Sequence, residues 1–150
     1  MKMDMLPYSL TALIAFSGIF AGKALAHFSQ EEMAAGKKHF LLLHKIILAA
    51  IAVLLANAFG IGFVSKAVIY AVVIIALFLV KKTRSELIYP SLGAMFFLGS
   101  KTGYFVEVSS LIFICGFPAG SLISKKQGFA KMLLYHSPFL AVALALYVFF

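Results

Sequence analysis

FLLLHKIILAAIAVLLANAF occupies residues 40–59, and His44 and Lys45 are its only ionisable side chains. About 20 consecutive apolar residues in a helix span the hydrocarbon core of a bilayer, which is about 30 Å thick. The stretch therefore predicts a transmembrane helix, with its ionisable residues close to one end. Lys45 is long enough to extend its amine toward the nearer interface.

Similar stretches fill most of the chain. Apolar residues make up 63% of the 150 residues and charged residues 12%, against about 45–50% and about 25% in soluble domains. A soluble fold could not cover so much apolar surface. We predict one all-α, multi-pass domain of the cell membrane over residues 1–150, with six spans at Leu6–Ala26, Phe40–Phe59, Val64–Val80, Ser85–Gly99, Tyr104–Ile123 and Phe129–Phe150.

The first span also resembles a secretory signal, because Lys2 precedes an apolar run that ends in Ala24-Leu25-Ala26. Two features oppose that interpretation: Lys23 interrupts the region before the small-residue site, and the apolar run is long for a signal. We expect an uncleaved transmembrane helix.

Basic residues are distributed unequally between the connectors. If all six segments cross, one side receives Lys37, Lys38, Lys81, Lys82, Arg84, Lys125, Lys126 and Lys131, whereas the other receives Lys2, Lys66 and Lys101. The positive-inside rule places the first group in the cytoplasm and both termini on the non-cytoplasmic side. These cations sit at helix ends and not in one patch, so contact with anionic lipid headgroups is expected and nucleic-acid binding is not.

The first and fifth spans share the pattern L-I-x3-G-x2-A-G-x2-[LI], which begins at Leu13 and at Leu111. Each is followed by a basic connector and by a span with a histidine near its inner end. We therefore consider a parallel repeat in which spans one and two recur as spans five and six. Chance similarity in a chain rich in Leu, Ala and Gly is the alternative.

Both copies of the pattern contain glycines four residues apart, Gly18 with Gly22 and Gly116 with Gly120. Small residues at this spacing allow two helix backbones to approach closely in a membrane. We expect packing within the chain, and dimerisation is the alternative use of the same faces. Gly36, before the second span, is expected to end a short interfacial helix.

Five residues are candidates for binding an ion or solute. Glu107 lies about one turn inside the outer end of the fifth span, close to Tyr104, and a carboxylate in hydrocarbon needs a partner or a proton. Pro118 removes one backbone N–H and should interrupt or kink the fifth helix, as Pro138 should bend the sixth. His44 and His136 are expected at similar depth near the inner side, where imidazole can relay protons.

The sequence lacks the residues that several classes of catalytic and metal site require. Asp4 is the only aspartate and Cys115 the only cysteine, so aspartate-rich magnesium sites, disulfides and CxxC sites are excluded. The chain has no HExxH, GxSxG or glycine-rich phosphate loop. No metal site and no cofactor are predicted.

Three functions remain. The first is a small transporter or channel-like protein for an ion or small solute, working between spans one, two, five and six, and assembled as a homo-oligomer. The second is a non-catalytic scaffold or accessory subunit that packs on a membrane protein partner. The third is a membrane enzyme acting on a phosphorylated lipid, which requires His44, His136 and the inner cations to converge.

Overall fold

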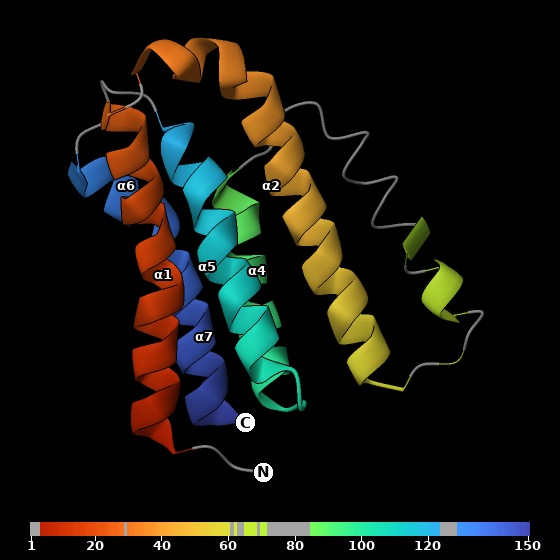
Figure 1. Ribbon diagram of the computed structural model, residues 1–150. Helices are drawn as coiled ribbons and strands as arrows, with labels where there is room; N and C mark the ends of the chain where they lie inside the picture. The colour runs from red at the N-terminus through yellow and green to blue at the C-terminus, as the bar shows by residue number, and fades with distance from the viewer. Residues whose placement is uncertain are drawn as a thin grey trace.

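The computed structural model describes residues 4–28, 30–60, 62, 65–68, 70–71, 85–123 and 129–150. All regular secondary structure in this part of the chain is α-helical (Figure 1). Its principal helices are α1 (Met5–Phe28), α2 (Gln30–Ala58), α4 (Ser85–Ser100), α5 (Phe105–Ser121), α6 (Phe129–His136) and α7 (Pro138–Phe149).

The predicted first, fourth and fifth spans correspond to α1, α4 and α5 within a few residues at each end. Two helices, Met5–Phe28 and Gly36–Ala58, are long and apolar enough to cross a membrane, by length and composition. α4, α5 and α7 are apolar but shorter. Most of the predicted third span, Val64–Val80, lies outside the described residues, although 65–68 and 70–71 are helical.

The second predicted span is longer than expected, because α2 starts at Gln30 and continues through Gly36. The expectation that Gly36 ends a separate short helix is therefore wrong. A single glycine costs a helix interior only about 1 kcal/mol relative to alanine. Continuing the helix keeps the backbone hydrogen bonds on both sides of Gly36, which outweighs that cost.

The sixth predicted span is divided into α6 and α7 at Ser137. Pro138 is the cause, since it has no N–H to continue α6 but its fixed φ suits the first position of a new helix. The Ser137 amide still donates to the Leu133 carbonyl at 2.8 Å, and the Ala141 amide donates to the Ser137 carbonyl at 3.0 Å. The chain thus passes from α6 into α7 while the amide and the carbonyl of Ser137 both remain hydrogen-bonded.

α1 and α5 run parallel and side by side (Figure 1). Their contact is made by backbone, because a Cβ built on Gly18 would meet the Phe113 carbonyl, and one built on Gly116 would lie 2.6 Å from the Gly18 carbonyl carbon. Any side chain at these positions would force the helices apart. Dense backbone contact of this kind is what small residues one turn apart permit.

The same contact is reciprocal across the repeated pattern. Gly22 and Gly120 are equivalent positions in the two copies, as are Ile19 and Phe117. A Cβ on Gly22 would meet the Phe117 backbone, and a Cβ on Gly120 would meet the Ile19 backbone. The two copies of the pattern therefore use equivalent residues to contact each other.

Two further contacts complete the bundle. α2 lies on α5 through residues spaced three or four apart, His44, Ile47, Ile51 and Leu55, all of which are buried. α4 lies on α7, where a Cβ on Gly93 would lie 3.1 Å from the Ala143 amide nitrogen. Small residues thus set the closest approaches at both the α1–α5 and α4–α7 contacts.

Aromatic rings fill the core toward the start of α1. The ring of Tyr8 is fully buried and stacks on Tyr147 at 4.4 Å between centroids, with Phe96 edge-on at 5.1 Å. Its hydroxyl donates to the Ala143 carbonyl of α7 at 2.9 Å. This hydrogen bond satisfies the one polar atom of a side chain that otherwise contributes apolar contact.

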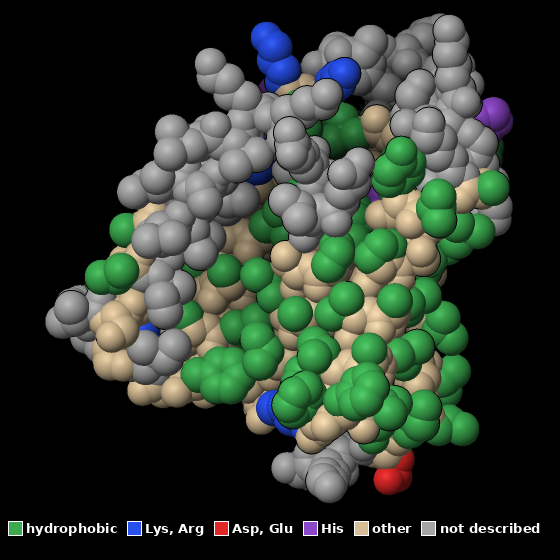
Figure 2. All heavy atoms as spheres, turned by 180° about the vertical axis from the view of Figure 1, so that it is seen from behind, with side chains coloured by type: hydrophobic (Ala, Val, Ile, Leu, Met, Phe, Trp, Pro, Cys, Tyr) green, Lys and Arg blue, Asp and Glu red, His purple; other side chains and the backbone are tan. Residues whose placement is uncertain are grey.

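The bundle has two chemically different ends. The end where α1 finishes and α2 begins, which we term the Lys37 end, exposes Lys37, Lys38 and His39. The opposite end, termed the Lys101 end, contains the start of α1, the end of α7 and the α4–α5 connection (Figure 1). Apolar side chains cover much of the flank between the ends in Figure 2. Large apolar side chains that are exposed in the described part of the chain include Leu6, Leu13, Ile14, Val106 and Leu134.

Replacing Gly22 with alanine is expected to lower the melting temperature by several degrees. The new Cβ would lie 2.8 Å from the Phe117 Cα, and backbone cannot yield unless α1 and α5 separate; overpacking costs about 1–3 kcal/mol. Thermal unfolding in detergent, followed by circular dichroism, measures the change. Gly103→Ala is the matched control because a Cβ there meets nothing within 4 Å. Equal losses in both variants would contradict the packing argument.

Candidate polar site between four helices

Four polar or titratable side chains from four different helices are buried in the otherwise apolar interior. They come from α2, α4, α5 and α6 and are exposed by 1–5%: His44, Tyr89, Cys115 and His136. We term this set the polar site. Polar groups in an apolar interior are costly unless they find partners, so their contacts decide what the set can do.

His44 and Cys115 form the first pair. The Nδ1 atom of His44 lies 3.3 Å from the Sγ atom of Cys115, and both atoms are buried. The thiol can donate to an unprotonated ring nitrogen, or accept from a protonated one. Either arrangement joins α2 to α5 by a polar contact within their apolar interface.

His136 is fixed by its own helix and by Tyr89. Its Nδ1 lies 2.6 Å from the Met132 carbonyl oxygen, and since a carbonyl only accepts, Nδ1 carries the hydrogen. In the neutral ring Nε2 is then the acceptor nitrogen. The Tyr89 ring lies edge-on to the imidazole, with centroids 4.2 Å apart and planes at 66°.

Tyr89 lies in the same buried core cluster as Cys115. Its ring contacts His136. No hydrogen-bond partner for the Tyr89 hydroxyl occurs in the described part of the chain. A buried hydroxyl without a partner is rare in folded proteins and calls for a physical explanation.

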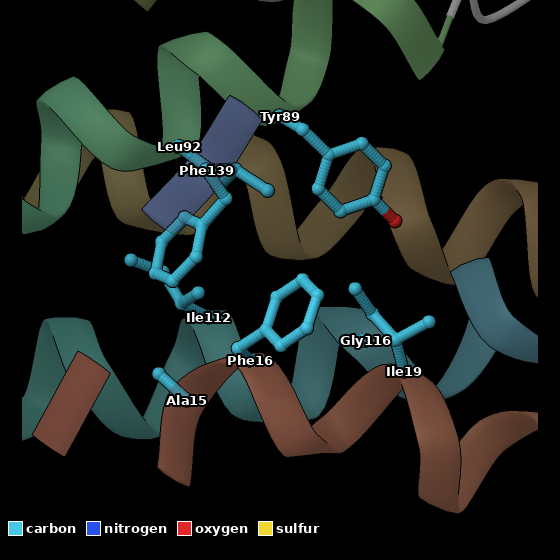
Figure 3. Close-up of a pocket in the computed structure, with 8 residues that line it drawn as sticks. All are labelled: Ala15, Phe16, Ile19, Tyr89, Leu92, Ile112, Gly116 and Phe139. Carbon is cyan, nitrogen blue, oxygen red and sulfur yellow. The ribbon is translucent and has the colours of Figure 1, made fainter. Parts of the chain in front are cut away.

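A small cavity lies beside Tyr89 (Figure 3). α1 contributes Ala15, Phe16 and Ile19 to its wall, and the remaining wall consists of Tyr89, Leu92, Ile112, Gly116 and Phe139. The volume open to the centre of a water-sized sphere is about 10 Å³, close to the minimum needed for one water molecule. Tyr89 supplies the only polar side chain in this wall.

The other predicted binding residues lie apart from the polar site. Glu107 and Tyr104 are exposed at the Lys101 end, and Glu107 precedes Cys115 by eight residues, about 12 Å along a helix. Neither lines the cavity. The structure therefore brings His44 and His136 into one cluster of buried groups and leaves Glu107 and Tyr104 at the surface.

Pro118 is buried inside α5, which continues past it to Ser121. The expected interruption of the fifth helix is absent there. The reason is its position in the last turn, where the Pro118 carbonyl accepts from the Leu122 amide at 3.1 Å and from the Ser121 hydroxyl at 2.9 Å. These bonds close the helix end around the proline.

The predicted lipid-contacting cations are only partly described. Lys37 and Lys38 are exposed at the Lys37 end. The others lie outside the described residues: Lys81, Lys82, Arg84, Lys125 and Lys126.

Sequence reasoning missed two members of the polar site. Neither Tyr89 nor Cys115 was among the five residues predicted to bind an ion or solute. The available signal was the placement of Tyr89, Leu92 and Phe96 on one face of α4, because that spacing marks a buried helix face. Their partners on α5 and α6 could not be read from spacing, since they depend on how the helices are rotated.

The described residues contain no group of three His, Cys, Asp or Glu side chains arranged to hold a metal ion. No protein-family model, curated protein or solved structure matches the chain. The groups that the polar site offers for chemistry are two imidazoles, a thiol and a phenol.

Replacing Cys115 with alanine is expected to destabilise the protein by about 1–3 kcal/mol, because the buried His44 nitrogen then loses its partner. Cys115→Ser, which keeps a donor, should lose less. In a His44→Phe background the order should reverse, since the serine hydroxyl would be unpaired. Chemical denaturation of the two Cys115 variants, of His44→Phe and of the two double variants measures this coupling. Additive effects of Cys115→Ala and His44→Phe would show that the two side chains do not interact.

Proposed function

We propose that the chain is a six-span membrane protein with the Lys37 end in the cytoplasm. Support comes from two helices of spanning length and composition, from the exposed apolar side chains and from the unequal distribution of Lys and Arg among the connectors of the sequence. Water would leave these apolar side chains unfavourably hydrated, whereas lipid chains would solvate them. Anionic headgroups are the partners proposed for Lys37 and Lys38.

The orientation can be tested with single cysteines. In a Cys115→Ser background, we expect Lys101→Cys to react with a membrane-impermeant maleimide added to intact cells. Lys37→Cys should react only after the membrane is permeabilised. Both lysines are exposed in the structure, so accessibility within the protein is matched. Equal labelling of the two positions in intact cells would contradict the orientation.

Within the membrane, we propose transport or channel-like conduction of a small ion, with the proton as the species that fits best. The observation that carries this proposal is the convergence of two imidazoles, a thiol and a phenol from four helices. Ionisable groups buried among membrane helices are costly to bury, and they mark ion pathways and proton relays in many membrane proteins. Histidine suits a relay because it gains and loses a proton near neutral pH.

The groups of the polar site are also of the right kind for protons. Hydroxyl, thiol and imidazole each donate and accept hydrogen bonds, so a proton can pass along them without a continuous open pore. The adjoining cavity is far smaller than the roughly 300–1,000 Å³ of ordinary ligand pockets. A larger solute would need space that the wall of this cavity does not provide.

A scaffold or accessory role is the second candidate. The close contact between α1 and α5 favours it, because the packing there is as dense as a purely structural bundle requires. That same contact buries Gly18, Gly22, Gly116 and Gly120 inside the chain. A partner or second copy would therefore dock on the exposed apolar flank and not on these glycines.

Proton flux into liposomes separates the two candidates. We expect purified protein to dissipate a pH gradient when potassium and valinomycin hold the membrane potential at zero, and His44→Ala to reduce the flux about tenfold or more. Glu107→Gln is the matched control: it also alters a titratable side chain, but one that is exposed and outside the polar site. Flux no greater than in empty liposomes would reject conduction and leave the scaffold role.

A further inference from the structure

The buried Tyr89 hydroxyl is the strongest unexplained feature of the interior. The side chain is 4% exposed, and no group in the described part of the chain accepts from or donates to its hydroxyl. Leaving such a group unpaired destabilises the folded state, because the hydrogen bonds that the hydroxyl makes with water before folding are not replaced. Tyr8, by contrast, is equally well buried but has its hydroxyl paired to the Ala143 carbonyl.

The cavity beside Tyr89 offers room for a partner. Tyr89 enters from α4, and in Figure 3 its hydroxyl points toward the side where Ile19 and Gly116 lie. Gly116 has no side chain, so it presents backbone to the cavity wall. The volume of about 10 Å³ open to the centre of a water-sized sphere meets the requirement of one water molecule.

We propose that this cavity is a binding site for a single internal water, which hydrogen-bonds to the Tyr89 hydroxyl. Size and chemistry both limit the occupant. The cavity is too small for a solute of several heavy atoms, and its otherwise apolar wall would not compensate an ion for its lost hydration. Internal waters of this kind bridge buried polar groups that lack protein partners.

The water would also add a hydrogen-bonding group next to the polar site. Gly116 of the cavity wall directly follows Cys115, which contacts His44. A water on the Tyr89 hydroxyl would supply one further donor and acceptor beside the contact between Tyr89 and His136. Its role in conduction rests on the proposed function, whereas its presence does not.

Infrared spectroscopy of the purified protein in lipid tests for the water directly. Exchange of the solvent into H₂¹⁸O should shift an O–H stretching band of an internal water in the wild type, and Tyr89→Phe should abolish that band. The band should survive in Tyr8→Phe, which removes a buried tyrosine hydroxyl that has a protein acceptor. Absence of an ¹⁸O-sensitive internal band from the wild type would overturn the proposal.

The melting temperature of Tyr89→Phe is an independent test, because a bound water and an unpaired hydroxyl predict changes in opposite directions. If the hydroxyl binds water, Tyr89→Phe loses a hydrogen bond and should melt about 2–4 °C lower. If the hydroxyl is unpaired, removing it relieves its desolvation cost, and the variant melts at the same or a higher temperature, which overturns the proposal. Tyr8→Phe should melt lower in either case and shows that the assay detects a lost bond. Neither measurement depends on proton flux, so failure of the conduction proposal would be recognised separately.

Discussion

The contact between the backbones of α1 and α5 is the constraint on which the rest of the bundle depends. Gly18 and Gly22 meet the backbone of Phe113 and Phe117 directly, and no larger residue fits. Because lipid offers no hydrophobic driving force between helices, close van der Waals contact must hold them together in a bilayer. α2, α4 and α7 then pack around this central pair, which places their buried faces at fixed positions.

That arrangement also determines the chemistry of the interior. α5 turns Gly116 toward α1 and presents Cys115, the preceding residue, to His44 of α2. α4 and α6 bring Tyr89 against His136. α5 thus supplies both the closest packing contact, through Gly116, and one member of the polar site, through Cys115.

The two ends of the bundle serve different purposes in the proposed function. The Lys101 end has tightly packed aromatic rings, among them Tyr8 and Tyr147, whereas the polar site lies farther along α5. A proton pathway would need to cross both regions. The Tyr8 hydroxyl in the first region is paired to the Ala143 carbonyl, whereas Tyr89 in the second lines the cavity.

The sequence by itself determined the helical class and the position of several helices. Apolar length located α1, α4 and α5 within a few residues at each end, because backbone hydrogen bonding and apolar periodicity act over one or two turns. The repeated glycine pattern indicated close packing of α1 and α5, since only small residues permit it. The course of α2 through Gly36 and of α5 through Pro118 depended on the bonds that surround them.

Only the tertiary structure decided that Tyr89 and Cys115 join His44 and His136 while Glu107 stays at the surface. Which side chains meet depends on the rotation and depth of each helix, and those are set by contacts between residues far apart in the chain.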